Sequence, residues 1–273
     1  APLIAETHVQ PAVQPGGDIP RNFHGTAVVI FPPAEAGGAG GKAMVEDGLM
    51  SRFGIDEVYG MHNYPNMPAG SFGLRPGPIM AAADFVTIDI EGVGGHAARP
   101  HLTVDPVVVG AHIITAIQSI VGRNVDPVKS AVVSITMVKA GTTDNVIPQR
   151  VRLDGTARSL SEDVRVLVEE RLRTLVENTA AAFGATGKLT YRRNYPVLVN
   201  HELQTVFAGD VASEIAGAAR VDRELPPMMG AEDFSFMLNE RPGAFIWIGN
   251  GPSAGLHHPS YNFNDEIIPF GTS

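Results

Sequence analysis

The 273-residue sequence contains no cysteine and no basic run. The absence of cysteine excludes disulfides, thiolate metal ligands and a cysteine nucleophile from this chain. Twenty basic residues stand against 29 acidic ones, giving a net charge of −9, so we expect no binding of nucleic acid through its phosphates. The N-terminus shows no basic stretch followed by an apolar one, and the expected location is therefore cytoplasmic.

Long hydrophobic runs are also scarce. The longest uncharged run, residues 106–122, contains His112 and Gln118 and is slightly too short to cross a bilayer. It predicts a buried helix and no membrane association. Hydrophobic residues still make up 44% of the chain, which argues against intrinsic disorder. At about 150 residues per domain, the length predicts one large domain or two ordinary ones.

The first 82 residues predict an α/β layer. Residues 25–31 form an apolar run of strand length that two prolines end, and residues 40–50 have the pattern of a short helix. Residues 56–63 predict a second strand, which ends near His62. A strand, a helix and a strand in succession are typical of α/β domains.

The middle of the chain, residues 83–195, predicts a separate small domain. Its expected elements follow the order strand, helix, strand, strand, helix, strand, which is the order of a ferredoxin-like unit. These elements cover residues 83–92, 106–121, 130–141, 150–160, a long helix that begins after Ser161, and 188–197. Asp105-Pro106 and Ser161 are the expected helix starts.

Residues 196–273 predict the return of the α/β layer, with an amphipathic helix at 203–218 and an apolar strand at 243–250. The expected domains are therefore 1–82 and 196–273, which together form one α/β domain, and 83–195, which is inserted into it.

Three apolar strands lead to groups that could bind a metal or move a proton. They precede Glu35, His62 and the pair His257–His258. A carboxylate and two imidazoles at neighbouring strand ends would suit zinc or a similar ion, and a carboxylate beside it could act as a base. Each group also has a simpler interpretation, because a histidine can be merely hydrogen-bonded and Glu35 could cap the following helix.

Two glycine-rich loops offer further sites. Residues 35–43 resemble a phosphate-binding loop, but Ala36 and Ala43 occupy two positions that such a loop needs as glycine and as serine or threonine. A nucleotide-binding protein is an alternative that rests on this loop alone. Residues 92–101 could expose His96 on a sharp turn, or could be a plain surface loop. No Gly-x-Ser-x-Gly elbow supports a serine triad.

Nine sequence words occur in an order that resembles the metal-dependent aminoacylase and hippurate hydrolase family. This family includes plant hydrolases of auxin–amino-acid conjugates and is related to carboxypeptidase G. The resemblance covers about residues 23–270. The words are PAEAGG, GKAMVEDGL, YGMHN, GPIMAAADF, GGHAARPH, DNVIPQ, LDGTARSL, PPMMGAEDFSF and LHHPSYNFND.

The resemblance implies a mixed-sheet α/β metallopeptidase domain with an inserted ferredoxin-like lid that also mediates dimerisation. It implies hydrolysis of N-acyl amino acids or short peptides by a metal-bound water, with two divalent ions such as zinc, manganese or cobalt. Matched word by word, Glu35 is the general base, and His62 and His257 are metal ligands. Glu232 and Asp233 are expected to support the site, and His258 to be solvated or behind the ligands.

Three lid residues also match by word. His96 corresponds to a histidine that stabilises the oxyanion in the neighbouring subunit's site, which implies a homodimer. Asn145 and Arg158 correspond to residues that hold the substrate and its carboxylate. Without the resemblance, Arg158 could simply pair with an acid, and Asn145 could shape the turn before Pro148.

The chain also departs from the family pattern. The family has a His-Ala-Cys-Gly-His-Asp word upstream that this sequence lacks, and Ala36 stands where the family has a second glutamate ligand. We therefore expect an N-terminally truncated catalytic domain. The alternative function is that of an impaired relative with an incomplete metal site, which acts as a binding or dimerisation module.

Overall fold

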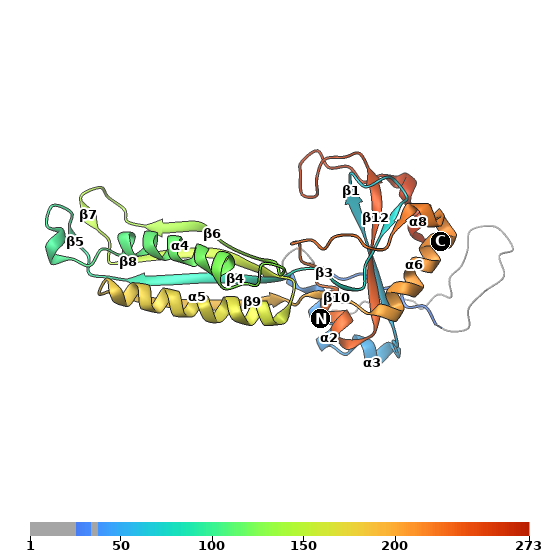
Figure 1. The fold of residues 1–273 in the computed structure, drawn as a ribbon, viewed down its shortest axis with the longest axis horizontal. Coiled ribbons are helices and arrows are strands. Elements are labelled where there is room, and N and C mark those ends of the chain that lie inside the picture. Colours follow the sequence, from blue (N-terminus) through green and yellow to red (C-terminus); the bar gives the residue numbers. More distant parts are fainter. Residues whose placement is uncertain (1–25, 34–37, 273) are drawn as a thin grey trace. The chain divides into compact units, whose positions relative to one another are not determined.

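The computed structural model describes residues 26–33 and 38–272. The chain divides into two compact units. Unit 1 comprises Ala1–Gly77, Asn200–Leu225 and Asp233–Ser273, and unit 2 comprises Pro78–Val199 and Pro226–Glu232. Along the sequence, the main segment of unit 2 lies between two segments of unit 1 (Figure 1).

Unit 1 is built on a four-stranded mixed sheet of order β1-β12-β2-β11. The strands are β1 (Val58–Pro65), β2 (Phe72–Gly73), β11 (Val221–Asp222) and β12 (Gly243–Gly251). β12 runs parallel to β1 and antiparallel to β2. All nine residues of β12 are buried, as in a strand that is covered on both faces. The expected α/β class with a mixed sheet is confirmed.

Short helices and one longer helix complete unit 1. They are α2 (Gly40–Glu46), α3 (Leu49–Phe53), α6 (Glu202–Ala216), η2 (Ala218–Arg220), α7 (Ser235–Glu240), η3 (Asp265–Ile267) and α8 (Ile268–Thr272). Ala208 and Ala212 of α6 lie in one apolar cluster with Ile246 and Ile248 of β12. The small side chains let the helix approach the sheet closely.

Two expectations for unit 1 are corrected. Residues 26–31 form no strand, and Val29 and Phe31 are 62% and 76% exposed, because no strand in the described part of the chain pairs with them. The single helix expected at 40–50 divides into α2 and α3. Gly48 between them has φ = 86°, a left-handed conformation that ends the first helix.

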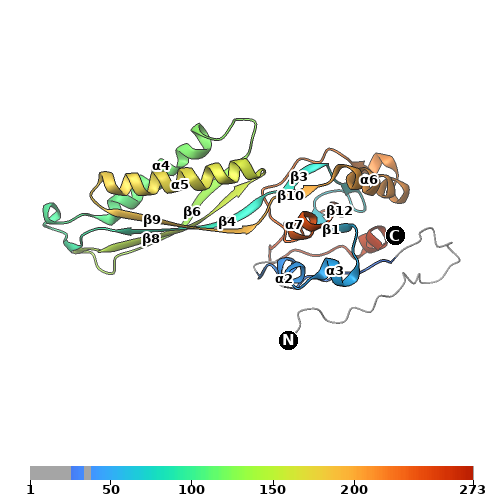
Figure 2. The same ribbon diagram turned by 90° about the horizontal axis from the view of Figure 1, so that it is seen from below.

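Unit 2 has an antiparallel sheet of order β6-β8-β4-β9, and α4 and α5 both lie on one face of it (Figure 2). The elements in chain order are β4 (Ala82–Glu91), α4 (Pro106–Arg123), β6 (Ala131–Ala140), β8 (Arg150–Ser159), α5 (Glu162–Ala182) and β9 (Thr186–Tyr195). This is the strand–helix–strand–strand–helix–strand order that the sequence predicts, and the boundaries differ by a few residues.

The core of unit 2 is formed by alternate residues of its strands and by helix residues spaced three and four apart. Every second residue of β4 enters it, including Val86 and Ile88, and α5 contributes residues at steps of three and four, including Val168 and Leu172. Asp105 caps α4 as expected, because its Oδ1 accepts a hydrogen bond from the Val107 N–H at 2.8 Å. Ser161 holds the corresponding position before α5, but its side chain does not accept a capping bond.

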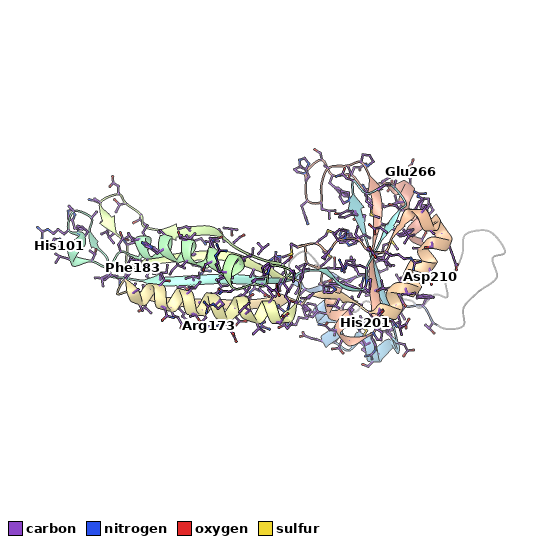
Figure 3. All side chains as sticks on the ribbon, in the orientation of Figure 1. His101, Arg173, Phe183, His201, Asp210 and Glu266 are labelled. Atoms are coloured by element: carbon purple, nitrogen blue, oxygen red, sulfur yellow. The ribbon has the colours of Figure 1, made fainter. Side chains whose placement is uncertain are left out.

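α4 is long and apolar enough to cross a membrane by length and composition alone. Core helices pass the same test, and Ile113, Ile117 and Ile120 of α4 are fully buried in the core of unit 2. Phe183, at the end of α5, is labelled in Figure 3. Its ring stacks on that of His112 of α4, with ring centroids 4.6 Å apart. The packing supports the expected buried helix.

Five short elements remain. β3 (Gly77–Met80) pairs with β10 (Leu198–Asn200), and β5 (Gly95–His96) pairs with β7 (Val146–Ile147). η1 (Pro100–Leu102) follows β5.

Candidate metal and substrate site

His62 lies on β1, half-buried, with its ring 5.2 Å from that of Trp247 on β12. Its Nδ1 is 2.7 Å from the carbonyl oxygen of Asn63. A carbonyl oxygen only accepts, so Nδ1 must carry the proton, and the lone pair of the neutral ring is then on Nε2. In this tautomer a histidine can bind a metal through Nε2 while its Nδ1–H donates a hydrogen bond to a carbonyl oxygen.

His257 lies in the loop after β12 and is exposed, with φ = 64°. Non-glycine residues rarely adopt this left-handed conformation, and such residues cluster at functional sites. The neighbouring His258 is hydrogen-bonded within the loop, because its Nδ1 accepts from the Ser260 N–H at 3.1 Å. Nε2 of a neutral His258 then carries the proton and has no lone pair for a metal. The local geometry thus favours His257 over His258 as a ligand.

The His257 loop is tied to the strand that carries His62. Asn63, the next residue of β1, donates a hydrogen bond from Nδ2 to the hydroxyl of Tyr261. Burial raises the pKa of Tyr261. The base of the loop is held by Asn250, whose Oδ1 accepts from the Asn264 N–H at 2.9 Å. The structure therefore brings together the strand that carries His62 and the loop that carries His257.

Glu35 lies outside the described residues, and the next helix along the chain is α2. Asp233 is 1% exposed, and its Oδ2 accepts a hydrogen bond from the Gly41 N–H in α2 at 2.6 Å. A Cβ at Gly41 would lie 2.9 Å from Cγ of Asp233, so this position needs glycine. Asp233 fixes the start of α2. Its second oxygen, Oδ1, is buried and has no hydrogen-bond partner among the described residues.

In unit 2, the structure brings His96 and Asn145 together. The β5–β7 ladder pairs His96 with Val146, and the Ala97 N–H donates to the carbonyl oxygen of Asn145 at 3.1 Å. The Ala98 N–H donates to Nδ1 of His96 at 3.1 Å. Nδ1 is therefore the acceptor, and Nε2–H of the exposed ring is available as a donor. This is the opposite tautomer to that of His62.

Arg158 lies on β8 at the other end of the sheet. It pairs with Ala83 near the start of β4, whereas His96 follows the end of β4 at Glu91 (Figure 1). At about 3.4 Å per residue, the eight residues from Ala83 to Glu91 span about 27 Å. The substrate-holding roles expected of Asn145 and Arg158 stay a prediction, and the structure places Asn145 next to the segment of His96.

Arg158 has no ion pair with an acid among the residues that the structure describes. Its Nη1 donates to the Thr156 hydroxyl, and to the Ala157 carbonyl oxygen at 3.0 Å. Burial lowers the pKa of Arg158, and the carboxylate of Asp84 opposes this shift. Asp84 itself is bonded to Arg165 and accepts from the Tyr191 hydroxyl. The simpler interpretation of Arg158, as half of an ion pair, is not what the structure contains.

Comparisons with known proteins identify the lineage. Residues 18–273 match the model of the peptidase family M20/M25/M40. The chain belongs to this family. It is 36% identical to an N-acetylcysteine deacetylase of Bacillus subtilis, over 89% of this chain and 63% of that protein. It is 37% identical to a hippurate hydrolase of Campylobacter jejuni, over 91% of this chain and 65% of that protein. The resemblance that the sequence words carry is confirmed.

One solved structure of the M20 family is similar over most of this chain. It is a Bacillus subtilis protein described as a dinuclear metal-binding peptidase, with a TM-score of 0.75 and 30% identity over 89% of this chain and 61% of that one. The chain thus spans less than two thirds of the length of these relatives.

The described residues fit a divalent metal only in part. The free Nε2 of His62 and the imidazole of His257 are suitable donors for an ion of the zinc type. Within residues 26–33 and 38–272, no group of three or more His, Asp or Glu side chains could hold a metal. Two imidazoles do not close a site, and no reaction step can be derived through a metal from these residues.

Sequence reasoning missed several site features. The Tyr261–Asn63 bond and the contact of Trp247 with His62 join distant segments, and no local pattern announces them.

Proposed function

We propose that this M20 family chain belongs to a metal-dependent amidohydrolase that cleaves the amide bond of N-acyl amino acids of the hippurate type, or of short peptides. The observation that carries the proposal is the free Nε2 of His62 beside the tethered loop of His257. The names of two relatives, a hippurate hydrolase and an N-acetylcysteine deacetylase, support the substrate class.

Two divalent ions of the zinc, manganese or cobalt type, held in part by His62 and His257, would supply Lewis acidity to the water and to the amide carbonyl. Glu35 removes a proton from the attacking water and returns it to the amide nitrogen as the C–N bond breaks. Arg158 binds the carboxylate of the substrate, because a guanidinium that has no acidic partner among the described residues suits a planar anion.

The Nε2–H of His96 donates to the developing oxyanion. The span of about 27 Å along β4 between Ala83, which pairs with Arg158, and Glu91, which precedes His96, supports a homodimer in which unit 2 acts as the lid. Arg158 then serves the site of its own subunit, while His96 and Asn145 serve the site of the neighbour.

Hydrolysis of hippurate and N-acetyl-L-amino acids tests this function directly. We expect the full chain to release amino acid only with added zinc or manganese. Glu35→Gln and His62→Ala should lower kcat by about a hundredfold or more, since each removes a general base or a ligand. His258→Ala is the matched control beside His257, and it should retain most activity.

The second candidate is the impaired relative, which the incomplete set of donors in the described residues favours. It predicts that the chain binds N-acyl amino acids without turnover, even with metal present. Binding with no product would contradict the hydrolase and support this alternative.

A further inference from the structure

Trp247 carries a buried donor that the described part of the chain does not satisfy. It is the only tryptophan in the sequence. It lies on β12 and is 2% exposed, and its indole Nε1 is buried with no hydrogen-bond partner among the described residues. Most buried polar groups in proteins have a partner, because an unpaired one loses its hydrogen bond to water without replacement. We therefore expect the indole N–H to meet an acceptor that these residues do not supply.

The position of this donor in unit 1 follows from the register of β12. Ala244, Ile246 and Ile248 belong to the apolar cluster that includes two alanines of α6. Successive residues of a strand point to opposite faces, so Trp247 lies on the face away from α6. In the parallel pairing with β1, Trp247 is opposite His62. The two side chains therefore lie side by side on one face, with ring centroids 5.2 Å apart.

The other rings around the indole offer it no hydrogen bond. The ring centroids of Tyr64 and Phe245 lie 5.3 and 5.5 Å from that of Trp247. A phenylalanine side chain has no acceptor, and neither the Tyr64 hydroxyl nor Nε2 of His62 bonds to the indole. A phenylalanine at this position would make similar ring contacts without burying an N–H. The packing thus explains an aromatic ring on β12 but not its donor.

His62 is held in place from two directions. Its Nδ1–H donates to the Asn63 carbonyl oxygen at 2.7 Å, and the indole ring packs against it at a tilt of 55°. These contacts restrict rotation of the imidazole, and the lone pair of Nε2 stays available. An available ligand nitrogen and an unsatisfied donor thus occur on paired residues of one face. An oxygen ligand of a zinc-type ion would suit both, because such an oxygen binds the ion and accepts from an N–H donor.

We propose that Trp247 is a positioning residue of the candidate metal centre. Its ring fixes the orientation of His62, and its Nε1–H donates to an oxygen ligand that joins the centre with the metal. The inference rests on the proposed function for the presence of the metal. The oxygen comes either from the protein and its solvent or from a bound carboxylate.

The single tryptophan makes the indole directly observable. In the isotope-labelled full chain, the indole N–H gives one NMR signal. A downfield shift of its proton with zinc alone would identify an oxygen of the protein or solvent, and a shift that also needs acetate would identify a bound carboxylate. Either shift supports the proposal. His62→Ala should keep its own metal-free signal in both titrations. An unshifted signal in the zinc-loaded wild type, with and without acetate, would overturn the proposal.

Trp247→Phe separates the donor from the ring. It keeps an aromatic contact with His62 and loses the N–H, so the zinc dissociation constant should rise by about ten- to a hundredfold, as measured by competition with a chromophoric chelator. Tyr64→Phe is the matched control, because Tyr64 contacts the same indole and loses its own polar hydrogen. Its zinc affinity should not change. Equal zinc affinities of wild type and Trp247→Phe, or equal losses in the two variants, would contradict the proposal.

Zinc binding and hydrolysis together separate this inference from the proposed function. An indole shift in a zinc-loaded chain that hydrolyses neither hippurate nor N-acetyl-L-amino acids would sustain the role of Trp247 and contradict the hydrolase. Hydrolysis by a zinc-loaded chain whose indole signal does not move would do the reverse. A folded chain that binds no zinc would overturn both.

Discussion

The carboxylate of Asp233 accepts a hydrogen bond from the backbone N–H of Gly41, at 2.6 Å, across 192 residues of sequence. This contact fixes the first turn of α2, which follows the segment that contains Glu35. The packing leaves no room for a side chain at Gly41, where a Cβ would lie 2.9 Å from Cγ of Asp233. The glycine-rich stretch that resembles a phosphate loop therefore has a packing explanation.

Gly41→Ala should destabilise the protein by about 1–3 kcal/mol, because the new methyl group forces Asp233 or α2 to move. The urea midpoint of unfolding measures the effect. Gly122→Ala is the control, since a Cβ there meets nothing within 4 Å in an exposed part of α4. It should be neutral, or stabilising by up to about 1 kcal/mol. Equal effects of the two substitutions would contradict the role of Asp233.

The ionisation of Asp154 makes the stability of the folded protein depend on pH in the acid range. Hydrogen bonds from Arg152 lower the pKa of Asp154 from 3.8 to about 2. The ionised carboxylate thus stabilises the folded state above about pH 4, and this contribution is lost as the pH falls toward 2.

Asp154→Asn should therefore be less stable than wild type at pH 5–7, by about 1 kcal/mol for a partly exposed pair. The difference should narrow to nothing near pH 2, as urea unfolding at several pH values would show. In an Arg152→Gln background, Asp154→Asn should lower the free energy of unfolding by less. A constant difference from pH 7 to pH 2 would contradict this origin.

Mixing two inactive variants tests whether His96 acts in the neighbouring subunit. His96→Ala and Glu35→Gln should each lose at least about a hundredfold in kcat. In a mixed dimer, the His96→Ala chain keeps Glu35, and the Glu35→Gln chain supplies its intact His96. We therefore expect partial recovery of activity after the variants are unfolded and refolded together. No recovery, despite mixed dimers, would place His96 in the site of its own subunit.

Much of the fold could be predicted from the sequence because its signals are local. The alternation of β4 and the three–four spacing of α5 each follow from one element's own residues, and the element order of unit 2 follows from these patterns. The strand at 25–31 could not be settled in this way. A strand also needs a hydrogen-bonded partner, and an apolar run does not reveal whether one exists.

The candidate site could likewise be predicted only where its signals are local. Sequence words indicated His62, His96 and Arg158, but they could not give the tautomers, which depend on the Asn63 carbonyl and the Ala98 N–H. Nor could they show that Asn145 and Arg158 lie far apart, because the distance between them follows from the register of β4 against β8.

The central claim is that the His62 and His257 segments form part of a metal centre. Elemental analysis of the full chain after incubation with zinc or manganese and removal of free metal tests it most directly. The account predicts close to two ions per chain, and a marked loss in His62→Ala and His257→Ala but not in His258→Ala. A metal content near zero in the folded wild-type chain would contradict it.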